Sequence, residues 1–117
     1  MDTPTNVSST ANASAQRRAP RFQLVTSAEV VELQTDTRFK ARTSDVSAVG
    51  CYIDMPNPLP VGTEIKLSLV HQDGTFTARG FVAQSESNLG MGISFTAVEV
   101  DQHGILERWI ANIRGTA

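Results

Sequence analysis

The fold is decided by residues 64–82, which read EIKLSLVHQDGTFTARGFV. In the first half of this stretch every second residue is apolar, namely Ile65, Leu67 and Leu69. A period of two predicts a β-strand with one buried face. The pair Asp73-Gly74 is a strong hairpin signal. The apolar face of the second half then comprises Phe76, Ala78, Gly80 and Val82. The stretch therefore predicts an antiparallel hairpin that lays one face on a core.

Further strands are predicted on both sides of this hairpin. They cover residues 24–33, 38–46 and 50–54 before it and residues 91–95 after it. The polar residues 34–37 separate the first two of these strands. Three prolines between positions 56 and 60 end the third, because proline cannot donate a hydrogen bond within a central strand. The chain is therefore predicted to contain six short strands.

Only the C-terminal region has a helical period. Its apolar residues recur at i, i+1, i+4, i+5 and i+8, and they are Ile105, Leu106, Trp109, Ile110 and Ile113. This stripe predicts an amphipathic helix, with Gly115 as its stop signal. Six strands followed by one helix predict an all-β fold, a small six-stranded antiparallel barrel with one C-terminal α-helix.

The length of 117 residues corresponds to one domain. Residues 1–15 are small and polar, and we expect a disordered tail there because such a segment buries too little apolar surface to fold. The folded domain is therefore predicted over residues 16–114. Neither a secretory leader pattern nor an apolar run of about 20 residues is present, so we expect a cytoplasmic protein without a membrane partner.

The charge distribution argues against a general nucleic-acid-binding protein. The net charge is −2, but residues 1–21 carry +2 through Arg17, Arg18 and Arg21 against Asp2, which leaves −4 on the rest. Proteins that bind nucleic acid through their folded body place a basic face there. We therefore expect no nucleic-acid partner, and the positive charge is confined to one place near the N-terminus.

Most residue combinations required for catalysis are missing from the sequence. His71 and His103 are the only histidines, and neither has a cysteine or carboxylate at metal-ligand spacing. We expect His71 to end a strand beside the Asp73-Gly74 turn and interpret it as a solvated turn residue. The single cysteine, Cys51, lies in an apolar strand, where a small core residue is favoured over a nucleophile. The sequence therefore predicts no catalytic residue, no metal site and no enzyme activity.

Two short segments have a composition suited to ligand binding. The first, residues 17–21, reads RRAPR and places three guanidinium groups within five residues. The second, residues 45–50, reads DVSAVG and lies where one predicted strand ends and the next begins. Taken singly, the first segment is also typical of a solubilising linker and the second of a turn.

In this order and context the two segments resemble the PilZ domains, which are receptors for cyclic di-GMP. Their signature is an R-x-x-x-R loop that leads into the first strand, followed by [D/N]-x-S-x-x-G. The matching residues are Arg17 and Arg21 for the first motif, and Asp45, Ser47 and Gly50 for the second. Two positions depart from the pattern. Gln16 stands where many members have an additional arginine, for which Arg18 is a partial substitute, and Val49 stands where many have a small residue.

The resemblance implies a cyclic di-GMP site with no other cofactor. Its residues would be Arg17, Arg18, Arg21, Asp45, Ser47 and Gly50. A guanidinium can bond the O6/N7 edge of guanine and also phosphate oxygens. Asp45 can accept from the N1–H and N2–H₂ edge, Ser47 can bond base or phosphate, and Gly50 allows a close backbone approach. In this interpretation the ligand orders an arginine segment that is loose before binding.

The resemblance leaves two functional hypotheses open besides the receptor. One is a PilZ-like adaptor that binds no ligand and acts through protein contacts, for example in pilus assembly or motility. The other is a small barrel that binds single-stranded nucleic acid, which would require surface aromatic residues and a basic groove. We favour the receptor, and we expect a downstream protein partner because the sequence shows no output domain.

Overall fold

The computed structural model describes residues 19–72 and 74–115. Its elements are β1 (Phe22–Gln23), β2 (Ser27–Glu32), β3 (Thr37–Val46), β4 (Gly50–Asp54), β5 (Glu64–His71), β6 (Gly74–Glu86), β7 (Gly90–Ala97) and α2 (Val100–Gly115). The expected disordered tail over residues 1–15 lies outside the described residues. The tail and the domain boundary after it therefore stay predictions.

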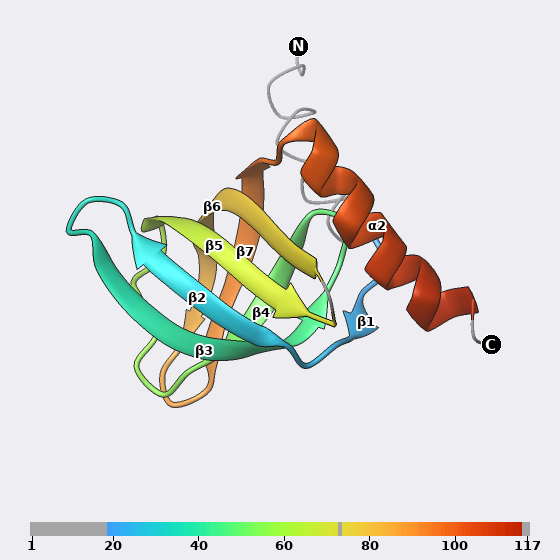
Figure 1. The fold of residues 1–117 in the computed structure, drawn as a ribbon. Helices are drawn as coiled ribbons and strands as arrows, with labels where there is room; N and C mark the ends of the chain where they lie inside the picture. Colours follow the sequence, from blue (N-terminus) through green and yellow to red (C-terminus); the bar gives the residue numbers. More distant parts are fainter. Residues whose placement is uncertain (1–18, 73, 116–117) are drawn as a thin grey trace, which may run out of the picture.

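Six of the strands close into an antiparallel barrel (Figure 1). They follow one another in the order β3-β2-β5-β6-β7-β4, and β4 pairs back with β3 to close the ring. The two-residue β1 pairs only with the end of β3. The predicted six-stranded barrel with one C-terminal helix is thus confirmed, and β1 is an additional strand that the sequence did not indicate.

The inside of the barrel is filled by alternate residues of each strand. The largest fully buried side chains include Val30, Ile53, Ile65, Leu67, Leu69, Phe76, Val82 and Met91. The apolar faces predicted for β5 and β6 are therefore the core faces. Cys51 is a free thiol in this core, and burial raises its pKa. Its interpretation as a small core residue is confirmed.

The β5–β6 hairpin forms as predicted, but its turn lies one residue earlier. His71 pairs with Gly74, so Gly74 already belongs to β6. The turn residue Gln72 has a positive φ of 55°, whereas Asp73 lies outside the described residues. His71 ends β5 beside this turn, as expected. It is half-buried, however, and its ring centroid lies 5.3 Å from that of Trp109, so the interpretation of His71 as a solvated residue is wrong.

The strand predicted over residues 24–33 is interrupted at its start. Gln23 of β1 pairs with Asp45 of β3, and Ser27 of β2 pairs with Arg42 of the same strand. Three residues, 24–26, therefore face only two residues of β3. Both β1 and β2 follow one side of β3, but the chain bulges between them.

Helix α2 lies across the end of the barrel that carries the β5–β6 turn (Figure 1). Leu106 and Trp109 are buried there, and the ring of Trp109 lies 6.3 Å from that of Phe76. The Thr77 N–H donates to the side-chain oxygen of Gln102 at 2.8 Å. The predicted apolar stripe is thus the face that packs on the barrel. Within residues 19–72 and 74–115, no helix has the length and apolarity to cross a membrane.

Candidate functional site

A β-bulge turns Asp45 to the outer face of the barrel. The register between β3 and β4 shifts between Thr43 and Asp45, which leaves Ser44 as an extra residue. Thr43 and Val46 are both buried although they lie three positions apart. The side chain of Asp45, between them, is 29% exposed. The bulge therefore presents one carboxylate to solvent between the buried residues Thr43 and Val46.

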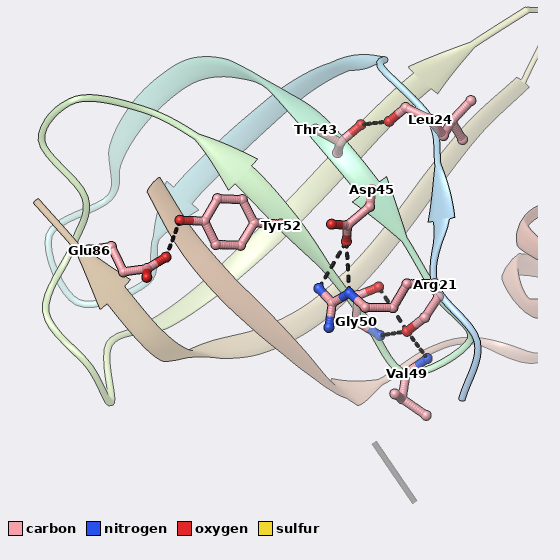
Figure 2. Close-up of polar contacts among 9 residues, drawn as sticks. Arg21, Leu24, Thr43, Asp45, Val49, Gly50, Tyr52 and Glu86 are labelled. Atoms are coloured by element: carbon pink, nitrogen blue, oxygen red, sulfur yellow. Dashed lines mark hydrogen bonds and ion pairs between the residues drawn. The ribbon is translucent and has the colours of Figure 1, made fainter. Parts of the chain in front are cut away.

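A buried threonine holds the chain that leads into this face. The Thr43 hydroxyl donates to the Leu24 carbonyl at 2.5 Å (Figure 2) and accepts from the Thr26 N–H at 3.1 Å. These two bonds tie residues 24–26 to β3 and set the position of β1, in which Gln23 is opposite Asp45. The chain two residues earlier, at Arg21, consequently lies beside Asp45.

Arg21 and Asp45 form an ion pair on the outer face (Figure 2). Nε and Nη2 of Arg21 donate to Oδ1 of Asp45 at 3.0 and 2.9 Å. A guanidinium has five N–H donors, and two of them are used here, which leaves three for a ligand. The Arg21 side chain is 53% exposed, so the pair is accessible and contributes at most about 1 kcal/mol to folding.

The position of Arg21, the part of the arginine segment that the structure describes, differs from the expectation. The sequence predicts three arginines on a loose segment, but Arg21 directly precedes β1 and is bonded to β3. Arg17 and Arg18 lie outside the described residues, and their contribution to the site stays a prediction. Of the predicted site residues, the structure brings together Arg21 and Asp45, with the turn of residues 47–50 at the end of the same strand.

Ser47 shapes this turn from inside. The residue is 3% exposed, and its hydroxyl accepts from the backbone N–H groups of Val49 and Gly50, each at 3.2 Å. The backbone adds a bond of 2.8 Å from the Ser47 N–H to the Gly50 carbonyl. The hydroxyl is therefore used within the turn, and a direct contact of Ser47 with a base or phosphate stays a prediction.

Gly50 is required because β7 passes close to it. A Cβ at position 50 would lie 2.1 Å from the carbonyl oxygen of Ile93, a contact that only displacement of backbone could relieve. Its φ lies outside the left-handed region, so an unusual backbone angle is not the reason for glycine here. The approach of the neighbouring strand thus explains this glycine, and its predicted close approach to a ligand stays a prediction.

Sequence analysis missed an aromatic residue beside the motif. Tyr52 is the cross-strand partner of Asp45, and its hydroxyl donates to the Glu86 carboxylate at 2.5 Å (Figure 2). Burial, together with this hydrogen bond, raises the pKa of Tyr52 to about 12. The available signal was strand alternation, because Cys51 and Ile53 point inward and Tyr52 must then point outward.

The first described residues of the chain lie next to the same turn. Pro20 and Ala48 line one hollow of about 270 Å³, whose other wall is the last part of α2 with Ile110 and Arg114. Ala48 also lines a second hollow of about 610 Å³, which is bounded by β7 and the start of α2. The chain that carries the arginines thus joins the described structure beside residues 47–50.

The described residues contain no group of three or more histidine, cysteine or acidic side chains able to hold a metal ion. The residues gathered at this face are instead a guanidinium, a carboxylate and a phenol, with backbone amides in the adjoining turn. Such groups recognise purine edges and phosphates through hydrogen bonds and stacking.

Several solved structures share this fold, two of which are the following. The Bacillus subtilis inhibitor of motility (MotI/DgrA) matches with a TM-score of 0.70 and 11% identity, over 86% of this chain and 52% of that one. The PilZ domain of CeSA from a cellulose-synthesizing bacterium matches with a TM-score of 0.62 and 17% identity, over 84% of this chain and 98% of that one. This chain therefore spans about half the length of MotI/DgrA. No curated protein sequence gives a significant match.

A match to a protein family settles what the fold alone leaves open. The sequence profile of the PilZ domain matches residues 15–112, which include both segments singled out in the sequence, the barrel and most of the helix. PilZ domains are ligand-binding or adaptor domains, not enzymes, and the family comprises receptors for cyclic di-GMP. The chain belongs to the PilZ domain family.

Proposed function

We propose that this protein is a receptor for cyclic di-GMP. The observation that carries the proposal is the ion pair of Arg21 and Asp45, held on the outer barrel face beside the turn of residues 47–50. Family members that have lost the ligand have no need of this combination of an accessible guanidinium and carboxylate.

The free groups of the pair match the guanine base and the phosphates. Both hydrogen bonds from Arg21 end on Oδ1 of Asp45. In the part of the chain that the structure describes, no hydrogen bond reaches Oδ2, which can accept from guanine N1–H or N2–H₂. The three unused N–H donors of Arg21 can bond phosphate or the O6/N7 edge. The pair therefore supports guanine recognition without first being broken.

Two further arginines precede the described chain by a short distance. Arg18 is two residues before Pro20, and two extended residues span about 7 Å. Since Pro20 and Ala48 line the same hollow, Arg17 and Arg18 can reach a ligand bound beside the turn. We propose that these arginines close over the ligand opposite Asp45, which gives the domain a ligand-dependent change of shape.

The proposed receptor acts through another protein. The described residues form a barrel and a helix and no output domain, so the liganded surface is what a partner would recognise. MotI/DgrA, which shares the fold, is named an inhibitor of motility, and a motility component is one class of partner to test. A nucleotide ligand and a free buried thiol both fit a cytoplasmic location.

Titration calorimetry with the full chain tests the proposal. Cyclic di-GMP should bind, and cyclic di-AMP should bind much more weakly because adenine lacks the O6 acceptor. GTP should also bind much more weakly, because it has a single guanine and no cyclic phosphodiester. Arg21→Ala should reduce the affinity by about 1–3 kcal/mol, or roughly 5- to 150-fold. Arg38→Ala is the matched control, since Arg38 forms a similar exposed ion pair with Glu29 at 3.7 Å on the far part of β3. Equal affinities for the two variants would exclude Arg21 from the site.

A further inference from the structure

An aromatic platform lies directly beside the Arg21–Asp45 pair. Tyr52 and Asp45 are opposite each other on neighbouring antiparallel strands, where Cβ atoms are about 5 Å apart. On the next strand, β7, Gly92 is the partner of Tyr52. Figure 2 shows the phenol ring extending from β4 toward Glu86 on β6. One aromatic ring thus extends the face that carries the carboxylate.

The ring of Tyr52 covers backbone on one side. A Cβ at Gly90 would lie 2.8 Å from Cε2 of the ring, and a Cβ at Gly92 would lie 4.0 Å from Cδ1. Any side chain at Gly90 would therefore collide with the ring. The two glycines let the phenol lie close to β7, and its other side is turned away from the barrel.

The hydroxyl of Tyr52 is anchored at the far end of the ring. It donates to the Glu86 carboxylate at 2.5 Å, and the Glu86 side chain lies on β6, two strands away from β4. An aromatic ring fixed at both ends loses little conformational freedom when a ligand packs on it, which favours binding. Because the Tyr52 hydroxyl already donates to Glu86, the part of the side chain that a ligand can use is the face of the ring.

We propose that Tyr52 is the stacking surface for the base that Asp45 recognises, an inference that rests on the proposed cyclic di-GMP function. The Cβ atoms of Asp45 and Tyr52 are about 5 Å apart, so a base whose edge reaches the carboxylate of Asp45 can extend over the neighbouring phenol ring. Stacking is tolerant of base identity, because every base has a π-face. Tyr52 therefore contributes affinity, whereas Asp45 and Arg21 contribute the preference for guanine.

The competing explanation is that Tyr52 only covers the glycines of β7. Aromatic side chains stabilise neighbouring strand glycines in this way. Two variants separate the explanations. Tyr52→Leu keeps an apolar cover over Gly90 and Gly92 but removes the π-face, whereas Tyr52→Phe keeps the ring and loses the bond to Glu86.

The test combines calorimetry with NMR on the full chain, and cyclic di-GMP is the probe. Tyr52→Leu should lower affinity roughly 5- to 100-fold, Tyr52→Phe should remain close to wild type, and Phe39→Leu, a half-buried aromatic elsewhere on β3, is the control. Tyr52 is the only tyrosine, so its ring signals in selectively labelled protein are unambiguous. They should move upfield on binding, and this readout does not depend on any variant folding.

The outcomes distinguish this inference from the function on which it rests. If wild type binds cyclic di-GMP but Tyr52→Leu binds equally well and the ring signals stay in place, Tyr52 is only a cover and the inference is overturned. If wild type does not bind at all, the receptor function fails and the stacking role fails with it.

Discussion

Replacing Ser47 by alanine separates the shape of the turn from contact with the ligand. The Ser47 hydroxyl is buried and accepts from two backbone amides at 3.2 Å, those of Val49 and Gly50. Val49 is half-buried, so water can replace its bond and the cost is about 0.5–1 kcal/mol. Gly50 is buried, and an unsatisfied amide there costs about 1–3 kcal/mol. Ser47→Ala should therefore lower the free energy of unfolding by about 1.5–4 kcal/mol.

Urea denaturation of the ligand-free chain measures this loss. For a domain of this size, about 1.5 kcal/mol corresponds to a decrease in Tm of at least roughly 6 °C. Ser85→Ala is the control, because Ser85 is exposed on β6 and its replacement should change the free energy of unfolding by less than about 0.5 kcal/mol. If Ser47→Ala unfolds like wild type but binds cyclic di-GMP more weakly, the hydroxyl contacts the ligand and our account of the turn is wrong.

Three other predictions concern the support of the site. Gly50→Ala should prevent correct folding because its Cβ would lie 2.1 Å from a β7 carbonyl. Gly104 lies in helix α2, and a Cβ there would meet no atom within 4 Å, so Gly104→Ala should stabilise the protein by about 0.5–1 kcal/mol. Thermal melts of both glycine variants test these two expectations. Thr43→Val should cost about 1–3 kcal/mol in urea denaturation, because a buried carbonyl and a buried amide lose their partner; an unchanged unfolding free energy would show that the hydroxyl does not anchor β1. Tyr52 has a pKa raised to about 12, so it stabilises the fold below its unfolded-state pKa of about 10, and this contribution is lost as the pH rises to about 12. A titration followed by tyrosinate absorbance should show the raised pKa of Tyr52, and Glu86→Gln should lower this pKa. A wild-type titration midpoint near pH 10 would contradict the structure.

The regular part of the fold was predictable from local patterns. The bounds of β4 agree with the predicted residues 50–54, because the prolines that follow end this strand. β5 contains the predicted alternating residues Ile65, Leu67 and Leu69 and ends before the predicted turn. The interruption at residues 24–26 was not predictable. It depends on the buried hydroxyl of Thr43, which is distant in sequence, and residues 24–33 keep a strand-like composition throughout.

The site was predictable only in its residue types. Arg21 and Asp45 are 24 positions apart, and nothing in their spacing shows that they pair; the family resemblance brought them together. The roles within the turn also needed the structure. Gly50 serves the approach of β7, and the Ser47 hydroxyl is occupied by backbone amides, which local sequence cannot distinguish from ligand contacts.

In the proposed receptor, the carboxylate of Asp45 binds cyclic di-GMP directly. The most direct measurement is calorimetric titration of cyclic di-GMP into wild type, Asp45→Asn and Asp45→Ala in parallel, with urea denaturation of each ligand-free protein. We predict saturable binding to wild type, weaker binding to Asn by about 1–3 kcal/mol, and a larger loss with Ala. All three should unfold within about 1 kcal/mol of one another, because the ion pair with Arg21 is exposed. Unchanged affinity in Asp45→Ala would contradict the account.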